Sequence, residues 1–457
     1  MKETNLNPIW KCPIGAIKGW NDEKKGVLRA TGIQYATAER FEMPTAKSIK
    51  ADGIIEATEW SPASPQPKDE FTDYLINQDY REMKVDEHCQ YLSVTIPSNT
   101  DATDNLPVMV WIHGGSYVTG AGDYPIYDPA VLVREEQVIV VTVTYRLGLL
   151  GYLGSEESTP ANLGLLDQIE ALKWVKQNIA GFGGNPENIT VFGESAGGDA
   201  AAHLMISEGT EGLFNKVIIQ SAPFGLMPAP KEMKALMLEE KKKVSVDDSL
   251  EKVAEVQASI QEIVKPFGLK SSMPFGVQYG EFPLPNEEDL DHEWEKAAAH
   301  IGILVGNNKR ELAPFVPYIP VLDQLTNTPI FGKYLSEVSI KYLTRKIYKS
   351  GVENFARRHA FAGGSGYKYE ISGGAPRNQL AGGHASEIPY IFENEELWEG
   401  SPILDGITWG KFHRQGQVLR QIWGVFAKTG QIKPVHVDGL IRIENISSKY
   451  RVYRSNR

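Results

Sequence analysis

The most constraining feature of the sequence is the pentapeptide Gly193-Glu194-Ser195-Ala196-Gly197. It stands between an apolar run, ITVF, and a run of small residues, GGDAAAHLM. A Gly-x-Ser-x-Gly motif in this context predicts a strand that turns sharply into a helix, with the serine exposed at the turn. Side chains larger than hydrogen at the two glycines would collide with the flanking strand and helix. The motif therefore favours an α/β architecture that presents Ser195 as a nucleophile.

Strand and helix patterns alternate through the middle of the chain. Residues 138–143 are apolar without alternation, which is typical of a parallel strand covered on both faces. A helix is predicted at roughly 164–180, and further strands are predicted in KVIIQSA and ILVGNN. Short apolar runs divided by turn residues in the first hundred residues indicate small antiparallel strands. We therefore expect a mostly parallel, doubly wound central sheet.

Several segments lie outside this alternation. Residues 60–89 are Pro-rich and then polar without a clear period, so we expect a long surface loop. Residues 229–268 are helical and highly charged, which indicates a helical excursion near the mouth of the sheet. Helices around 333–360 and an amphipathic helix over 415–430 complete what we expect to be a single catalytic domain, 1–457.

Charge and composition exclude some classes of partner. The formal net charge of -11 argues against nucleic acid, whose phosphates require a basic face. The sequence has no apolar run long enough for a signal peptide or a membrane span, so we expect a cytoplasmic protein without a membrane partner, although a secreted mature form would look similar. Two cysteines are too few for a disulfide framework or a cysteine-based zinc site. We expect no cofactor and no metal, and either a monomer or a homodimer.

A serine nucleophile needs donors for the negative charge that develops on its substrate. The block His113-Gly114-Gly115-Ser116-Tyr117 follows the strand VMVWI, and its small residues leave backbone N–H groups free. The N–H of Ala196, at the start of the helix after Ser195, is a further candidate donor. His113 could also be the catalytic base, but a histidine in this motif more often packs beneath the loop.

The base and its orienting acid are expected downstream of Ser195, because this architecture uses the chain order Ser, acid, His. The downstream histidines are His203, His292, His300, His359, His384, His413 and His436. Of these, His384 lies in a Gly-rich loop, GGAPRNQLAGGHASEIPYIF, where a catalytic histidine is expected. For the acid, Glu311 follows the late strand ILVGNN, although carboxylates are abundant elsewhere and position alone does not settle the choice.

Taken together, the motifs resemble the type-B carboxylesterase and cholinesterase family, and in particular its bacterial para-nitrobenzyl esterase type. The likeness runs nearly end to end, through the blocks GIQYATAERF, DEHCQYLSVTIP, PVMVWIHGGSYVTGAG, VTYRLGLLGYL, NITVFGESAGG, GNNKREL, GGHASEIPYIF and WGVFAKTG. The resemblance implies an α/β-hydrolase fold with helical insertions and a triad of Ser195, Glu311 and His384. It also implies oxyanion donors at Gly114, Gly115, Ser116 and Ala196, and a second carboxylate at Glu194 that supports the site or is simply structural.

The sequence departs from the family pattern at several positions. Ser64 stands where relatives with an early disulfide have a cysteine, so we expect Cys89 to be a free thiol. No tryptophan occurs between Trp60 and Trp111, which argues against recognition of choline esters by cation–π attraction. Lys309 and Arg310 stand where the family usually has an acidic neighbour of the triad glutamate. Glu311 is therefore the only carboxylate of this block that can serve as the triad acid. The chain is also shorter than most relatives before residue 280, which indicates a more open gorge.

The resemblance implies hydrolysis of small-molecule carboxylic esters through an acyl-enzyme. Two alternatives remain: an amidase, carbamate hydrolase or lactone hydrolase on the same scaffold, and a non-catalytic cholinesterase-like binding protein. The intact Ser195, Glu311 and His384 argue against the second alternative. Tyr117 and Phe224, which flank the oxyanion loop and a core strand end, are our candidates for the substrate pocket.

Overall fold

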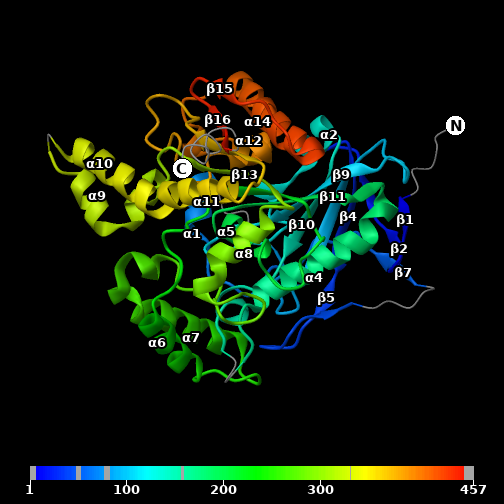
Figure 1. Ribbon diagram of the computed structural model, residues 1–457, viewed down its shortest axis with the longest axis horizontal. Coiled ribbons are helices and arrows are strands. Elements are labelled where there is room, and N and C mark those ends of the chain that lie inside the picture. The colour runs from blue at the N-terminus through cyan, green and yellow to red at the C-terminus, as the bar shows by residue number, and fades with distance from the viewer. Residues whose placement is uncertain (1–6, 48–52, 77–82, 156–158, 330, 447–457) are drawn as a thin grey trace.

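An eleven-stranded sheet forms the centre of the structure, a computed structural model that describes residues 7–47, 53–76, 83–155, 159–329 and 331–446 (Figure 1). The strand order is β15-β16-β14-β13-β12-β11-β9-β10-β8-β4-β3. The strands are β3 (Trp20–Asp22), β4 (Val27–Gln34), β8 (Tyr91–Pro97), β9 (Leu106–Ile112), β10 (Ile139–Thr144), β11 (Gly184–Glu194), β12 (Lys216–Gln220), β13 (Gly302–Asn308), β14 (Gly366–Ile371), β15 (Val435–Val437) and β16 (Ile441–Asn445).

The middle of this sheet is parallel, as the apolar runs predict. Strands β10, β9, β11, β12, β13 and β14 pair in parallel, and antiparallel strands flank them on both sides. In register, Gly193 lies beside Ile112 of β9, and Gln220 of β12 lies beside both Glu194 and Gly306. Because parallel strands end at one edge, the residues that follow β9, β11 and β13 come together there.

Helices cover both faces of the sheet. Alternate residues of β9 point to opposite faces: Val110 and Ile112 belong to one apolar core, and Met109 and Trp111 belong to the other. Helices α4 (Leu163–Asn178) and α5 (Ala196–Leu204) contribute to the first core, and α2 (Ala130–Glu136) and α14 (Trp409–Thr429) contribute to the second. The prediction of a doubly wound α/β-hydrolase fold is therefore confirmed.

The N-terminal strands form additional small sheets. Strands β1 (Ile9–Cys12), β2 (Gly15–Lys18) and β7 (Ile54–Glu56) make a three-stranded sheet, and β5 (Ala36–Thr37) pairs with β6 (Thr45–Ala46). The pairing of β1 with β2 is antiparallel, as expected. The pairing of β2 with β7 is parallel instead, because β7 returns from a distant part of the chain.

The prediction of a loop over 60–89 is wrong in part. Residues Glu70–Ile76 form helix α1, and the carboxylate of Asp69 caps it by accepting from the N–H of Thr72 at 3.0 Å and from its hydroxyl at 2.7 Å. The helix has seven residues, too few to display a helical period in the sequence. Residues 77–82 of the predicted loop lie outside the described residues.

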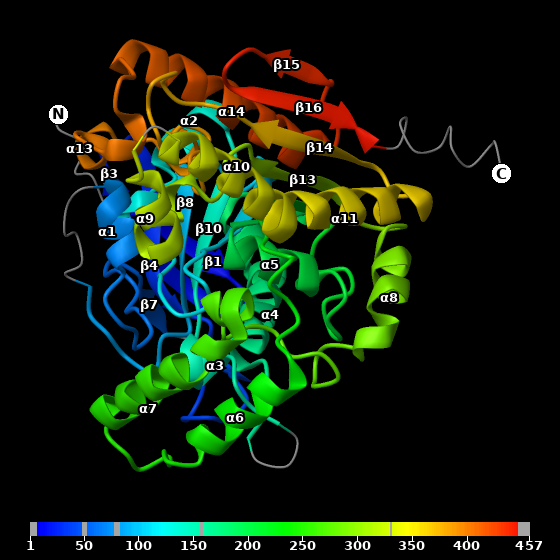
Figure 2. The same cartoon turned by 90° about the vertical axis from the view of Figure 1, so that its left-hand side faces the viewer.

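The helical excursion forms two helices, α6 (Lys231–Lys241) and α7 (Leu250–Ile263), at the lower edge of the molecule in both views (Figures 1 and 2). Further helices are α3 (Gly148–Gly151), α8 (Leu290–Ala297), α9 (Pro320–Thr326), α10 (Gly332–Thr344), α11 (Ser350–Phe361), α12 (Ile388–Ile391) and α13 (Glu395–Trp398), and the 3-10 segment η5 spans Ala313–Tyr318. Helix α14 begins six residues earlier than predicted, because Thr408 caps it by accepting from the N–H of Lys411. Within the described ranges, none of these helices has the length and apolar character needed to cross a membrane.

Candidate active site

Ser195 occupies a strained turn between β11 and α5. Its backbone has φ 56° and ψ -123°, and its N–H donates to the carbonyl of Gln220 at 2.9 Å. A Cβ atom on Gly193 would lie 2.4 Å from the carbonyl oxygen of Gly197, and one on Gly197 would lie 2.0 Å from that of Ile112. Neither position can hold a larger residue without movement of the backbone, so the two glycines are required for the turn.

Glu311 and His384 form a direct hydrogen-bonded pair. The Nδ1 atom of His384 lies 2.7 Å from Oε2 of Glu311, and the backbone N–H of His384 donates to the Glu311 carbonyl at 3.2 Å. The other carboxylate oxygen of Glu311 accepts from the N–H of Asn308, the last residue of β13, at 2.6 Å. Both side chains are buried. Glu311 is thus fixed to the end of a core strand and fixes the imidazole in turn.

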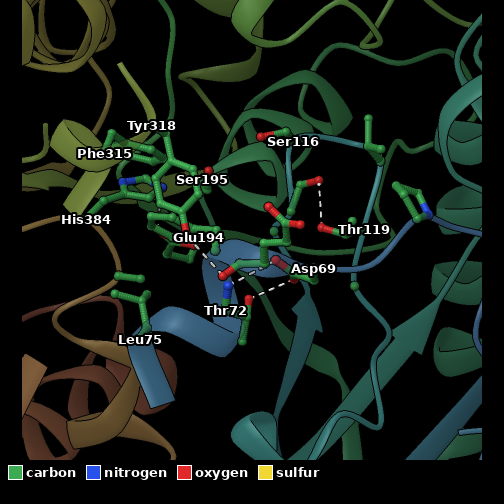
Figure 3. A pocket seen from close by; sticks show the side chains of 18 of the residues that line it. Asp69, Thr72, Leu75, Ser116, Thr119, Glu194, Ser195, Phe315, Tyr318 and His384 are labelled. Atoms are coloured by element: carbon green, nitrogen blue, oxygen red, sulfur yellow. Dashed lines mark hydrogen bonds and ion pairs between the residues drawn. The ribbon is translucent and has the colours of Figure 1, made fainter. Parts of the chain in front are cut away.

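A cavity of about 590 Å³ brings the predicted residues together. Gly114, Gly115, Ser116, Glu194, Ser195 and His384 all line it. In Figure 3 the side chain of His384 lies on one side of Ser195, and Ser116 and Thr119 lie on the other. Glu311 is fully buried and lies behind His384 rather than in the cavity lining. Three segments that are distant in the sequence therefore meet at one cavity.

The second imidazole nitrogen of His384 faces a second carboxylate. Its Nε2 atom lies 3.1 Å from Oε1 of Glu194, whose side chain is almost completely buried. Burial alone lowers the pKa of His384, but the negative charges of Glu194 and Glu311 outweigh burial and raise this pKa to about 9. Burial, together with the charges of Glu387 and Glu311, raises the pKa of Glu194 to about 8. The two groups thus lie close enough to share a proton.

The loop after β9 has the geometry of an anion-binding turn. Gly115 and Ser116 both have positive φ, 105° and 56°, and the carbonyl of Gly115 accepts from the N–H groups of Val118 and Thr119 at 2.9 Å. In the described part of the chain, the backbone N–H groups of Gly114, Gly115 and Ser116 donate to no protein acceptor. They are therefore available to a substrate carbonyl, as is the N–H of Ala196 at the first position of α5.

The other histidines near the site have structural surroundings. His113 is buried, its ring stacks on Tyr145 at 4.4 Å, and its Nδ1 atom lies 2.8 Å from the carbonyl of Gly114. Burial lowers the pKa of His113 to about 4. His203 is buried as well, between the carbonyl of Asp199 and the hydroxyl of Tyr279. Neither histidine is among the residues that line the cavity.

Tyr117 and Phe224, the two residues predicted for the substrate pocket, do not line this cavity. Tyr117 is fully buried, and its hydroxyl donates to the carboxylate of Asp199 at 2.7 Å, which draws the ring into the core. Phe224 stacks on Phe355 at a centroid distance of 5.4 Å. These two predictions relied on proximity along the chain, and the side chains point elsewhere.

Aromatic residues that sequence reasoning missed form a wall beside His384. Phe71 of α1 stacks on Phe315 of η5 at 4.5 Å, and the rings of both lie within 6.3 Å of the imidazole. Tyr318 lies against Phe71 and also lines the cavity (Figure 3). The unusual length of segment 60–89 was a signal of function, but it did not identify Phe71.

Glu387 is a third buried carboxylate near the imidazole. It accepts from the side-chain amides of Asn308 at 2.6 Å and Gln220 at 3.3 Å. Burial, followed by the charge of Glu311, raises its pKa. The block GGHASEIPYIF contains this residue, three positions after His384, but offers no local sign that its side chain turns inward.

The segment before Cys89 is held without a disulfide, as predicted. Cys12 and Cys89 are both free. The amide side chain of Gln66 instead joins this segment to the loop after β9, since it donates to the carbonyl of Gly120 at 2.9 Å and accepts from the Gly120 N–H at 2.7 Å. This pair of bonds fixes the position of α1 relative to the cavity.

Comparison with known proteins agrees with this geometry. Residues 7–328 match the model of the carboxylesterase family. The chain is 33% identical to a probable N-octanoylanthranilate hydrolase of Rhodococcus erythropolis, over 89% of this chain and 90% of the relative. It is 32% identical to the para-nitrobenzyl esterase of Bacillus subtilis, over 91% and 88% of the two chains. The solved structure of a thermophilic para-nitrobenzyl esterase superposes with a TM-score of 0.78 at 27% identity, covering 98% of this chain and 99% of that one.

The fold, the serine at the strand-to-helix turn and these matches over most of the chain agree with one another. The chain belongs to the carboxylesterase family and is a serine hydrolase of carboxylic esters.

Proposed function

We propose that Ser195, His384 and Glu311 act together as the catalytic triad of this esterase. The observation that carries the proposal is the 2.7 Å bond between His384 and Glu311, in a site where His384 and Ser195 line the same cavity. A carboxylate bonded to Nδ1 leaves Nε2 as the nitrogen that accepts the serine proton. Glu311 holds Nδ1 through this bond and orients the ring.

The reaction proceeds in two steps, acylation of Ser195 and hydrolysis of the acyl-enzyme. Ser195 Oγ attacks the ester carbonyl carbon while His384 takes the hydroxyl proton, and the tetrahedral intermediate collapses as the C–O bond breaks and the alcohol leaves with that proton. Water then attacks the acyl-enzyme, His384 takes a proton from that water, and the acid is released as the proton returns to Ser195. In both steps the N–H groups of Gly114, Gly115 and Ala196 donate to the oxyanion, and Ser116 supplies a further backbone donor.

Glu194 is a positioning residue in this scheme. It faces the same nitrogen of His384 that must accept the serine proton. Its negative charge stabilises the imidazolium that forms during attack, and it also competes with Ser195 for Nε2. The chemistry therefore requires His384 to exchange one partner for the other during turnover.

The cavity favours esters with an aryl or medium-length apolar group. Its volume of about 590 Å³ suits a small organic molecule, and the rings of Phe71, Phe315 and Tyr318 offer apolar area beside the nucleophile. The relative in Bacillus subtilis is named for a para-nitrobenzyl ester, whose alcohol part contains an aromatic ring.

A second candidate substrate class is the N-acyl amide. One relative, matched over 89% of this chain, is named for N-octanoylanthranilate, in which the acyl group is on nitrogen. The leaving group of an amide must be protonated by His384 before it departs. The leaving group of an ester depends less on this protonation. Turnover of matched octanoyl nitrophenyl ester and octanoyl nitroanilide distinguishes the two activities.

The triad is tested by reaction with an aryl organophosphonate, followed by mass spectrometry of the intact chain and of its peptides. We expect a single adduct on Ser195, and we expect Ser195→Ala to lose the adduct together with activity, on the order of 10⁶-fold in kcat. Ser116→Ala is the matched control, because it removes a hydroxyl from the same cavity but keeps the backbone donor. An adduct on another residue, or near-normal turnover by Ser195→Ala, would overturn the assignment.

A further inference from the structure

Helix α10 presents its apolar face to solvent. The residues that it buries are mostly small or polar, namely Gly332, Ser336, Ile340 and Thr344. Phe331, just before the helix, and Tyr334, Leu335, Val338 and Tyr342 within it are all exposed, and we call these five residues the apolar stripe. Their spacing places them along one side of the helix. Tyr334 is 70% exposed and Tyr342 is 63% exposed, so water surrounds most of each ring.

Such an arrangement is unusual for a helix at the surface of a globular protein, where the apolar side normally faces the core. Single exposed apolar residues need no explanation, but a contiguous set on one helix face indicates a surface that binds something. The stripe is therefore a candidate for an interaction site.

Basic residues flank the apolar stripe. Lys333, Lys341, Arg345 and Lys346 are exposed, whereas Glu337 is the single acidic residue of α10. The carboxylate of Glu337 binds Arg310 at 2.8 Å and lies 3.9 Å from Nζ of Lys341, a weak contact at the exposed surface. In a chain with a formal net charge of -11, this helix is thus a local positive region. Aromatic and aliphatic side chains bordered by lysine and arginine are typical of helices that lie in a lipid–water interface.

The stripe is connected to the wall of the catalytic cavity. Helices α9 and α10 pack together, project at the left of Figure 1 and face the viewer in Figure 2, where α1 lies on the same side of the molecule. Segment η5, which precedes α9, carries Tyr318, and this residue both lines the cavity and is 44% exposed. The Tyr318 hydroxyl donates to the carbonyl of Glu70 at 3.1 Å, which joins η5 to α1.

We propose that the apolar stripe and its flanking basic residues dock this esterase onto an anionic lipid–water interface, with the cavity wall at Tyr318 beside that surface. The apolar side chains enter the boundary between headgroups and acyl chains, and Lys341 and Arg345 extend to the negative headgroups. If α10 paired with α10 of a second copy, like charges would come together. This repulsion disfavours a dimer formed through the stripe. The expectation of no membrane partner depends on a search for long apolar runs. An interfacial helix is amphipathic, so such a search does not detect it.

The test is sedimentation of the full chain with vesicles of phosphatidylcholine, prepared with and without phosphatidylglycerol. We expect binding to the anionic vesicles and a loss of binding at high salt. The variant Tyr334→Ser with Val338→Ser removes apolar area, and the variant Lys341→Glu with Arg345→Glu reverses charge. Each double variant should lower the partition coefficient by roughly tenfold or more.

The matched control is Leu236→Ser with Val246→Ser, which removes two exposed apolar side chains from the excursion instead. It should bind vesicles as the unmodified chain does. All variants should hydrolyse a dissolved short-chain nitrophenyl ester at the normal rate, and this separates failure of docking from failure of the catalytic assignment. The proposal is wrong if the unmodified chain does not bind anionic vesicles, or if sedimentation velocity shows a dimer that the stripe variant abolishes while vesicle binding persists.

Discussion

The Nε2 atom of His384 lies 3.1 Å from Oε1 of Glu194, the residue immediately before the nucleophile. The imidazole therefore lies between two carboxylates, since Glu311 holds its other nitrogen at 2.7 Å. Both negative charges favour the protonated ring, and they raise the pKa of His384 to about 9 despite its burial. A base that is held protonated accepts no proton, so in the proposed triad Glu194 would set the pH range in which Ser195 is activated.

We predict that Glu194→Gln moves the acid limb of the kcat/KM profile to lower pH by roughly 1–3 units, the usual effect of one nearby charge. Activity requires neutral His384, so it rises as pH increases through the pKa of this residue. The amide keeps the shape of Glu194 but removes the charge that raises this pKa, and the pKa falls. The measurement is the pH dependence of kcat/KM for a nitrophenyl ester.

Glu187→Gln is the control for this experiment, because Glu187 is exposed and pairs with Lys176 on the surface. Its profile should match that of the unmodified chain. An unchanged acid limb in Glu194→Gln would mean that Glu194 does not govern the protonation of His384 in the free enzyme.

Replacement of Glu311 should lower kcat less than replacement of Ser195 does, but much more than replacement of another buried carboxylate does. We expect Glu311→Gln to lower kcat on the order of 10⁴-fold, because the amide no longer holds the required tautomer of His384. Glu387→Gln is the matched comparison: Glu387 is equally buried, but its oxygens accept from Asn308 and Gln220 rather than from the imidazole. Steady-state kinetics that place the larger loss on Glu387 would exchange the two roles.

Gly114 is predicted to tolerate no side chain. A Cβ atom there would lie 2.8 Å from the carbonyl oxygen of Glu194 and 3.1 Å from Cβ of Ser195, so Gly114→Ala must displace either the nucleophile or the oxyanion loop. Loss of one well-placed donor costs on the order of 10²–10³ in kcat, and we expect a fall of this size with little change in KM.

Gly410→Ala is the control for the glycine experiment. Gly410 lies in the first turn of α14, and the nearest atom to an added Cβ atom, on Arg414, is 3.5 Å away. Alanine favours helix over glycine, so this variant should be as stable as the unmodified chain or slightly more stable, with normal kinetics. If Gly114→Ala proves equally active, the loop does not supply the oxyanion donors.

Local sequence was enough to predict the parts of the site whose geometry is determined within a few residues. The positions of Gly193 and Gly197 follow from the tight turn at Ser195, where a Cβ atom would meet backbone oxygen at 2.4 Å or less. The unbroken apolar runs predicted the parallel strands, because a strand buried on both faces excludes polar side chains.

Contacts between distant segments could not be predicted in this way. Whether Glu194 faces His384 depends on the register of β11 and on the path of the loop after β14. These two segments lie far apart in the sequence. The stacking of Phe71 on Phe315 requires α1, whose first turn is capped by Asp69. Tyr117 stands next to the oxyanion loop in the sequence, but its bond to Asp199 turns it into the core. In each case side-chain direction was decided by a partner that the sequence does not identify.

The last prediction concerns stability and the buried ion pair between Arg146 and Asp167. The guanidinium binds the carboxylate through two nitrogens, at 2.8 and 2.7 Å, and the two side chains are 4% and 0% exposed. Asp167→Asn would leave a positive charge in the core without its partner, and such a change costs about 3–5 kcal/mol in the free energy of unfolding. The urea midpoint should fall accordingly, whereas Glu239→Gln, which breaks an exposed pair with Lys242, should leave it unchanged.

This comparison separates an effect of charge from an effect of burial. Both substitutions remove one negative charge from an ion pair with lysine or arginine, and both keep the size of the side chain. They differ in how far water can solvate the cation that remains, since the side chain of Lys242 is 73% exposed and that of Arg146 is 4% exposed. Equal urea midpoints for the two variants would mean that Arg146 finds another acceptor, and the carbonyl of Glu42, which it already contacts at 2.7 Å, would be the first to examine.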